Sequence, residues 1–372
     1  MNFLEEHLAY NFKNFEKLEP GHKYDYKQTV LKYIKHIEKF KNYIVWIEIH
    51  TSKTDIDVFF VENTTGLTFM SNKQELSKHF NYPNIVDTTK RLAKYITKYP
   101  FFVIRTGWDQ GEFTILDEPC VLRNCRKNKA TDFGIIIPES YHQNLDHLFP
   151  LIEKFKTITF SEKQNLLAWR GVNSGKHKGI GSRSHFVELF HETHDVKFIQ
   201  HPTMTRGNII IPSNQIAPKL PIDTMAKKYK FQVALDGNTA ASSLGWNLLS
   251  NSVVFITDVK DKYITFINPK QNIDYVAIKP NFEDLADKIQ YYTEHADEAE
   301  KIASNGRNYI IQLIESYPTI LDRTLDKIYS MYDQTTIVDA YDLLQKDFYL
   351  NGNQTRFTKM TFKMINNRYI AQ

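Results

Sequence analysis

The sequence predicts an α/β fold in which helices cross over parallel sheets, divided between two domains. Length gives the first observation: 372 residues, 42% of them hydrophobic, suffice for two domains with ordinary cores. The second observation is the rhythm of the second half, where short apolar runs alternate with helical periodicity. The third is that residues 100–106 and 133–137 contain continuous apolar runs, as strands buried on both faces do.

A first domain is predicted over residues 1–162 from the order of its periodic segments. Helical spacing opens the domain, and Pro20-Gly21 ends the first helix. Two alternating segments joined by a short turn then indicate strands. The expected elements are two helices, two strands, a helix and two buried strands, at residues 1–18, 27–40, 43–51, 55–62, 84–98, 100–106 and 133–137.

A second domain is predicted over residues 163–335, where strands and helices alternate regularly. The expected strands are at residues 165–170, 196–200, 229–235, 252–257 and 275–279. The expected helices are at residues 184–194, 240–250, 281–294 and 297–313. This alternation is typical of a parallel sheet with crossover helices. For residues 336–372 we expect a helical tail that packs back on the body.

Composition excludes several classes of protein. The net charge of +4 is far from the excess of a dedicated nucleic-acid binder, so we expect no nucleic-acid partner. The only two cysteines, Cys120 and Cys125, need no disulfide framework and show no metal-ligand spacing. The sequence contains neither a run of roughly 18 apolar residues nor a signal-peptide core. We therefore expect a cytoplasmic protein with at most peripheral membrane contact.

The first candidate site is the glycine-rich loop that follows the strand ending in Trp169-Arg170-Gly171. Lys176, Lys178 and Arg183 lie in this loop, and arginine forks onto phosphate oxygens while glycine lets backbone N–H groups approach an anion. The loop leads into the start of a helix, which adds partial positive charge. A diphosphate site is one interpretation. A flexible surface loop with solvated lysines is the other.

The second candidate is the end of the strand at residues 229–235. Asp236, Gly237 and Asn238 follow the strand, and the next predicted helix opens with small residues, Thr239 to Ser243. Small residues at a helix start let a phosphate reach the backbone amides. Thr239, Ser242 and Ser243 could add hydroxyl donors. Helix capping with close helix–sheet packing explains the same residues equally simply.

The third candidate is Asp109, which lies in a turn between two glycines after a buried strand. A carboxylate at such a position can accept the proton of an attacking hydroxyl. A turn-capping aspartate is the alternative. Glu112 and Asp117 are nearby rivals for the role of the base.

The order of several short motifs resembles glycosyltransferase family 90, the CAP10-like family. The resemblance covers residues 165–311 well and residues 100–138 weakly. The motifs are Trp169-Arg170-Gly171, Lys228-Tyr229-Lys230, Asp236-Gly237-Asn238, residues 248–255 and residues 275–279. The family includes bacterial enzymes that modify lipopolysaccharide and eukaryotic protein O-glucosyltransferases.

The resemblance implies a GT-B fold, in which two Rossmann-like domains face each other across a cleft. It also implies inverting transfer from a UDP-sugar bound to the C-terminal domain, without a metal or other cofactor. By position, Asp109 would be the catalytic base. The donor would be bound by Arg170, Gly171, Ser174, Arg183, Asp236, Gly237, Asn238, Thr239, Ser242 and Ser243.

One departure from the family is the small-residue stretch that ends at Ser243, where eukaryotic members carry a phosphate-binding arginine. Lys176, Lys178 or Lys230 would have to replace that contact. The resemblance, together with the expected cytoplasmic location, indicates a glycan acceptor such as a lipopolysaccharide, lipooligosaccharide or capsule precursor at the inner membrane. The alternatives are a non-catalytic nucleotide-sugar or carbohydrate-binding protein, a nucleic-acid binder, and an epimerase.

Overall fold

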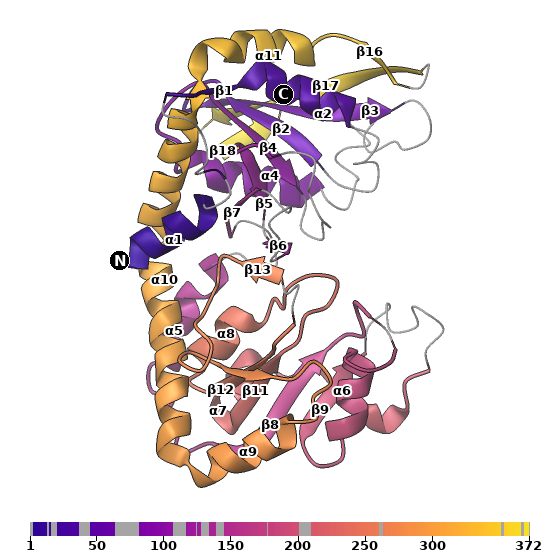
Figure 1. The fold of residues 1–372 in the computed structure, drawn as a ribbon, viewed down its shortest axis with the longest axis vertical. Coiled ribbons are helices and arrows are strands. Elements are labelled where there is room, and N and C mark those ends of the chain that lie inside the picture. Colours follow the sequence, from indigo (N-terminus) through magenta and orange to yellow (C-terminus); the bar gives the residue numbers. More distant parts are fainter. Residues whose placement is uncertain are drawn as a thin grey trace. The chain divides into compact units, whose positions relative to one another are not determined.

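The structure is a computed structural model that divides into two compact units (Figure 1). The first unit comprises Met1–Asn144 and Ser316–Gln372, and the second comprises Leu145–Glu315. The predicted boundary at residue 162 therefore differs from the observed one, and the chain returns to the first unit after residue 315. The described residues are 3–12, 15, 21–36, 45–63, 82–106, 117–123, 125–127, 134–138, 145–176, 178–200, 210–259, 263–350, 353–365 and 368–371.

In the second unit, the described residues form a six-stranded sheet in which every neighbouring pair is parallel. Numbered along the chain, the order is 3-2-1-4-5-6, which is the order of dinucleotide-binding α/β sheets. The order reverses between the first and fourth of these strands, β8 and β11. Across the sheet the strands are β10 (Ile216–Ala217), β9 (Asp195–Ile199), β8 (Gln164–Gly171), β11 (Tyr229–Ala234), β12 (Val253–Thr257) and β14 (Val276–Ile278).

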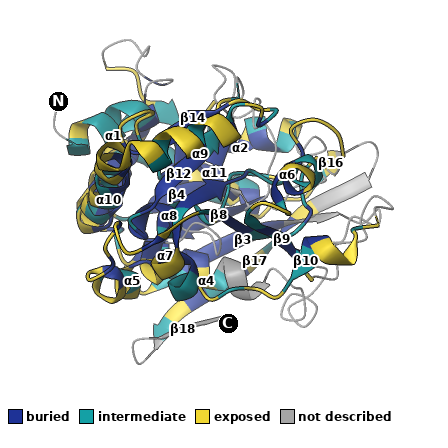
Figure 2. Ribbon diagram, turned by 90° about the horizontal axis from the view of Figure 1, so that it is seen from below, coloured by how far each residue is buried: buried dark blue, intermediate teal, exposed yellow. Residues whose placement is uncertain are grey.

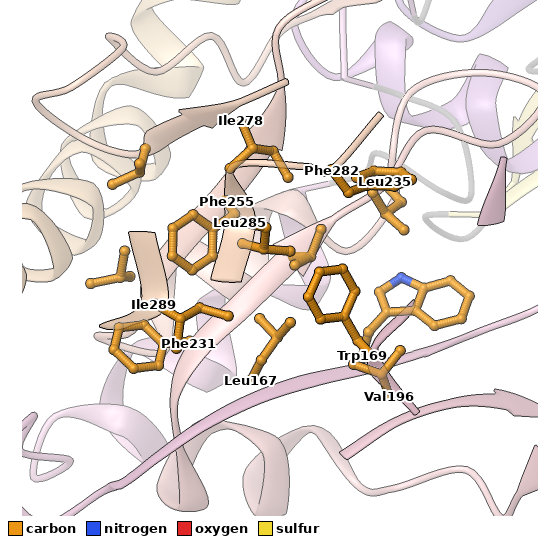
Figure 3. Close-up of a cluster of buried hydrophobic side chains, with 14 of the residues drawn as sticks. Leu167, Trp169, Val196, Phe231, Leu235, Phe255, Ile278, Phe282, Leu285 and Ile289 are labelled. Carbon is orange, nitrogen blue, oxygen red and sulfur yellow. The ribbon is translucent and has the colours of Figure 1, made fainter. Parts of the chain in front are cut away.

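The core of this unit forms because the strands are apolar on the faces that the helices cover. Leu167, Phe231 and Phe255 come from three adjacent strands and are fully buried. Leu285 and Ile289, one helical turn apart, join the same cluster (Figure 3). The helices of the unit are α5 (Phe149–Phe155), α6 (Arg183–Phe190), α7 (Ile222–Lys228), α8 (Leu244–Leu249), α9 (Leu285–Glu294) and the start of α10 (Ala296–Met331); β13 spans Tyr263–Thr265.

In the first unit, the described residues form an eight-stranded mixed sheet with the order β16-β17-β3-β2-β4-β5-β7, and β18 pairs with β17. Among the neighbouring strands described in this sheet, only the pairs β4–β5 and β5–β7 are parallel. The pairs of β2 with β3 and β4, and of β17 with β3, β16 and β18, are antiparallel. The elements of this unit are α1 (Phe3–Phe12), β1 (Tyr24–Asp25), α2 (Tyr26–Lys35), β2 (Val45–His50), β3 (Asp55–Asn63), α4 (Tyr82–Ala93), β4 (Phe101–Thr106), β5 (Val121–Arg123), β6 (Cys125–Lys127), β7 (Ile135–Ile136), β15 (Tyr332–Asp333), α11 (Ile337–Leu344), β16 (Phe348–Leu350), β17 (Asn353–Ile365) and β18 (Arg368–Ala371).

The helical tail predicted for residues 336–372 is wrong beyond α11. The chain instead continues as β16, β17 and β18, and β17 pairs with β3 from Thr355 opposite Asn63 to Lys363 opposite Asp55. Phe357 is buried, and Phe362 lies in the core cluster beneath the sheet. The physical reason is that β3 pairs with β2 along one edge only. The backbone N–H and C=O groups along its other edge need hydrogen-bond partners, and β17 supplies them. Local periodicity in the sequence does not reveal a strand partner that lies this far away along the chain.

Burial follows the sheets in both units. Figure 2 shows β4 and the middle of β8 buried, whereas α9 and α10 expose much of their outer surface. The helices therefore act as covers, and the strands carry the core. In the second unit this leaves the loops at the strand ends as the places where polar side chains can meet a ligand.

Candidate functional site

A cavity of about 180 Å³ lies at the carboxyl ends of β8, β11 and β12. Ligands of doubly wound sheets bind at this edge, where the strand order reverses, and β8 and β11 flank that reversal here. The wall of the cavity combines two cationic side chains, one carboxylate, hydroxyl groups and apolar side chains. The lining residues are Ser174, Lys176, Gly181, Ser182, Arg183, Leu235, Asp236, Gly237, Thr257, Val259 and Phe282.

The loop between β8 and α6 forms one side of the cavity. The hydroxyl of Ser182 accepts a hydrogen bond from the His185 N–H at 3.1 Å and caps α6. The first-turn N–H groups of this helix carry partial positive charge. Lys176 also lines the cavity, and its ammonium donates to the Ile180 carbonyl at 2.9 Å. This side of the cavity is therefore suited to an anion.

The guanidinium of Arg183 lies between the two loops that border the cavity. It donates to the Val172 carbonyl at 2.9 Å and to the Ser174 hydroxyl at 2.8 Å. It also donates to the carbonyls of Leu235, at 2.6 Å, and Asp236, at 3.2 Å, directly after β11. Burial lowers the pKa of Arg183 to about 10, against the opposing effect of Asp236. The side chain is therefore still a cation at neutral pH.

The turn between β11 and α8 forms another side of the cavity. The Asp236 carboxylate accepts a hydrogen bond from the Ala241 N–H at 2.9 Å, and the Gly237 N–H donates to the Thr239 carbonyl at 2.8 Å. These bonds hold the chain in a turn, so α8 begins only at Leu244. The predicted start of this helix at residue 240 is therefore wrong. The Asp236 carboxylate competes for the backbone N–H groups that would form the first turn of the helix.

A second, smaller hollow of about 50 Å³ adjoins the cavity, because Asp236 and Thr257 line both. Its wall is mostly apolar or small, with a few polar groups. The other lining residues are Ala234, Ala240, Ala241, Leu244, Ile256, Tyr263, Thr265, Ile267, Asn268, Pro269 and Tyr275. Mostly apolar walls with a few placed polar groups are typical of small-molecule sites.

The structure brings together part of the predicted donor site. Ser174, Arg183, Asp236 and Gly237 line the cavity, and the exposed Asn238 accepts a hydrogen bond there from the loop between β8 and α6. The other predicted residues line neither hollow: Gly171, Thr239, Ser242 and Ser243. Gly171 instead leaves room for the Trp169 ring, which a side chain at this position would meet.

Arg170 does not join this group. Its guanidinium is ion-paired with the Asp195 carboxylate, and it also donates to the Asp195 carbonyl at 2.7 Å. The Tyr229 hydroxyl donates to the same carboxylate. Asp195 and Tyr229 are the first residues of β9 and β11, so the guanidinium lies toward the amino ends of these strands. The structure therefore gives Arg170 a packing role and no contact with the cavity.

The predicted base, Asp109, and its rival Glu112 lie outside the residues that the structure describes, so the assignment of the base stays a prediction. The second rival, Asp117, is about half exposed and forms an ion pair with Lys32. The neighbouring Glu118, which the sequence patterns did not single out, is buried and accepts a hydrogen bond from the Tyr332 hydroxyl at 3.1 Å. Burial raises the pKa of Glu118.

Sequence reasoning missed several lining residues of the cavity, among them Ser182, Thr257, Val259 and Phe282. Thr257 is the last residue of a predicted strand, β12. The position of β12 beside β11 in the sheet places this residue near the switch point. Phe282 comes from a turn far along the chain, and only the folded sheet brings it to the cavity.

Two further features concern metals and membranes. Within the described ranges, no group of three His, Cys, Asp or Glu side chains is placed to hold a metal ion. Among the same residues, no helix combines the length and apolarity needed to cross a bilayer.

The strand order and the cavity define the class of the second unit: a doubly wound α/β unit with a cavity at its switch point. Comparison with known families then gives a more specific result. The model of glycosyl transferase family 90 matches residues 143–319, which include the whole second unit. The resemblance inferred from the motifs is thereby confirmed.

Individual relatives agree with this match. O-glucosyltransferase LpsA of Dichelobacter nodosus is 26% identical over 162 residues, covering 42% of this chain and 46% of that protein. Protein O-glucosyltransferase 2 of Danio rerio is 39% identical over 83 residues, covering 22% of this chain and 16% of that protein. The matches thus span less than half of each relative.

Among solved structures, a glycosyltransferase from Rickettsia africae ESF-5 is similar with a TM-score of 0.35 and 15% identity, covering 57% of this chain and 63% of that chain.

Proposed function

We propose that the protein is a glycosyltransferase whose second unit binds a nucleotide-sugar donor. The observation that carries this proposal is the cavity at the switch point, where Arg183, Lys176 and the capped start of α6 meet. A diphosphate placed there would meet two cations and the positive end of a helix. The match of residues 143–319 to a glycosyltransferase family supports the same assignment.

The two adjoining hollows suit the two halves of such a donor. The larger one is cationic and fits the diphosphate. The smaller one, with its apolar wall and the polar groups of Thr265 and Asn268, fits a group with both flat apolar faces and polar edges. We assign it to the nucleoside, and we propose uridine because the family that the motifs resemble uses UDP-sugars.

The reaction we propose is a single displacement with inversion at the anomeric carbon. An acceptor hydroxyl oxygen forms the new bond to that carbon, and the bond from the carbon to the diphosphate oxygen breaks. The electron pair of the broken bond leaves with UDP, while the hydroxyl proton passes to a carboxylate, for which we propose Asp109. The sugar passes through an oxocarbenium-like state, as in glycoside hydrolysis.

Stabilisation of the leaving diphosphate is the second requirement of this reaction. Arg183 and Lys176 supply positive charge at the cavity without a metal ion, so we propose a metal-independent enzyme. Removing one such donor typically costs about 10²–10³ in rate. We also propose GT-B architecture, with the first unit taking part in acceptor binding.

For the acceptor we propose a hydroxyl of a bacterial glycan precursor, such as one of lipopolysaccharide, lipooligosaccharide or capsule. The name of the Dichelobacter nodosus relative, O-glucosyltransferase LpsA, supports glucose as the first donor sugar to test. The proposed location is the cytoplasm, with peripheral contact with the inner membrane.

The test is a panel of UDP-sugars offered to the purified protein with and without EDTA, with thermal shift and UDP release as readouts. We expect one UDP-sugar to raise the melting temperature, since a ligand that binds only the folded state stabilises it. EDTA should leave this shift unchanged. Asp109→Asn should bind the same donor and lose turnover. If no UDP-sugar shifts the melting temperature, the donor-site assignment is wrong.

A further inference from the structure

The two loops that border the cavity touch each other with no space between them. Gly175 of the β8–α6 loop packs on Gly237 of the β11–α8 turn so closely that a Cβ at Gly175 would collide with the Gly237 carbonyl group. A Cβ at Gly237 would in turn lie 2.5 Å from the Ser174 hydroxyl oxygen. We call this meeting of Ser174, Gly175, Gly237 and Asn238 the inter-loop contact.

Hydrogen bonds fix the inter-loop contact. The amide oxygen of Asn238 accepts from the Gly175 N–H at 2.9 Å. Arg183 donates to the Ser174 hydroxyl on one loop and to the Leu235 and Asp236 carbonyls before the other. One guanidinium and one amide therefore join two segments that are far apart in the sequence and that both line the cavity.

Two glycines of the same loop differ sharply in their surroundings. Gly175 and Gly179 both have positive φ, +77° and +86°, so both favour glycine for conformational reasons. Only Gly175 is pressed against another backbone. The nearest atom to a Cβ at Gly179 is the Lys176 Cε at 3.8 Å, an ordinary contact. The backbone conformation is thus a shared requirement, whereas the close approach is specific to Gly175.

We propose that Gly175, Asn238 and Arg183 are positioning residues that set the width of the donor cavity by locking the inter-loop contact. This inference rests on the proposed function, because it concerns the same cavity. The guanidinium of Arg183 donates its hydrogen bonds to protein oxygens. This residue therefore acts on the diphosphate through its positive charge and by holding the two loops in place. A shift of about 1 Å in such a loop can cost roughly 10²-fold in activity.

The experiment compares Gly175→Ala with Gly179→Ala by titrating each variant with UDP and with UMP, in calorimetry, beside the wild-type protein. Both substitutions impose the same kind of backbone strain, and Gly175→Ala adds the collision with Gly237, so we expect Gly175→Ala to lower the melting temperature without ligand more than Gly179→Ala does. We expect Gly175→Ala to weaken UDP binding at least about tenfold and UMP binding less, because the inter-loop contact borders the diphosphate site. Gly179→Ala should change UDP affinity by less than about twofold.

Asn238→Ala tests the same inference without a collision, since the side chain is exposed and only the acceptor for the Gly175 N–H is removed. We expect about a threefold loss of UDP affinity, with KM for the donor raised and kcat nearly unchanged, which follows from the worth of one exposed hydrogen bond. A merely structural role would lower the melting temperature and leave the ratio of UDP to UMP affinity unaltered.

The possible outcomes separate the two proposals. If wild-type protein binds no UDP, the proposed function fails and this inference falls with it. If wild-type protein binds UDP and Gly175→Ala binds it as tightly as Gly179→Ala does, the proposed function stands and the positioning role is overturned. A selective loss in Gly175→Ala, matched by a smaller loss in Asn238→Ala, supports the role of the inter-loop contact.

Discussion

The two units differ in how far along the chain their sheet partners lie. In the second unit, neighbouring strands follow one another through single crossovers, so β8, β9 and β10 are side by side, as are β11, β12 and β14. In the first unit, β3 pairs with β17, which comes from the other end of the chain. Local periodicity identifies an element but not its partner, so the fold of the second unit could be predicted more fully than that of the first.

The largest effect should come from breaking the long-range pairing. Phe362 of β17 is 1% exposed and packs with Trp46, Ile56 and Val58 in the cluster beneath the sheet. We expect Phe362→Asp to destabilise the first unit by more than about 5 kcal/mol, because loss of the ring alone costs about 3–5 kcal/mol and a buried carboxylate adds to it. Denaturant unfolding followed by tryptophan fluorescence measures the change.

Lys363, the next residue of β17, is exposed and provides the control. Lys363→Ala should change the free energy of unfolding by about 0.5 kcal/mol or less. Equal effects of the two substitutions would contradict the pairing of β17 with β3, since the register places only Phe362 against the core.

A smaller effect is expected from the buried carboxylate of Glu48, which is 0% exposed. The Trp46 indole N–H and the Thr89 hydroxyl both donate to its Oε1 at 2.7 Å, and the His50 Nε2 lies 3.0 Å from its Oε2. Burial would raise the pKa of Glu48, but Arg105 and these hydrogen bonds outweigh it and lower the pKa to about 2. Glu48→Gln should cost about 3 kcal/mol, because it removes the negative charge that interacts with the buried guanidinium of Arg105.

The sign of the pH dependence follows from this lowered pKa. The contribution of Glu48 is fully present above the ordinary pKa of 4.5 and is lost as the pH falls toward 2. Unfolding measured between pH 5 and pH 2.5 should therefore show a steeper loss of stability for wild-type protein than for Glu48→Gln. Parallel curves for the two proteins would refute the ionised, buried state of this side chain.

The sequence gives strong signals for site residues where a strand ends, and weak ones elsewhere. Ser174, Arg183, Asp236 and Gly237, which we singled out in the segments that follow β8 and β11, line the cavity. Phe282 was not singled out, since it reaches the cavity from a turn that only the complete sheet positions. The long-range strand β17 was missed for a similar reason, because its backbone partners lie on β3 at the other end of the chain.

The smallest predicted effect concerns Arg170, for which the motif and the structure point to different roles. The structure pairs its guanidinium with Asp195, so Arg170→Gln should destabilise the protein by about 1.5–3 kcal/mol through lost charge-assisted hydrogen bonds. Its affinity for UDP should change by less than about twofold. Thermal unfolding and calorimetric titration measure the two quantities. Unchanged stability with a tenfold weaker affinity would restore the diphosphate role.

The proposed donor site lies in the second unit, at the switch point between β8 and β11. Hydrogen exchange followed by mass spectrometry, with and without saturating UDP, tests this claim directly because it locates the ligand without a substitution. We expect slower exchange in peptides covering residues 172–183 and 235–243, and unchanged exchange in peptides covering β17. Protection confined to the first unit, or no protection of either loop while UDP is bound, would show that the donor does not bind at this switch point.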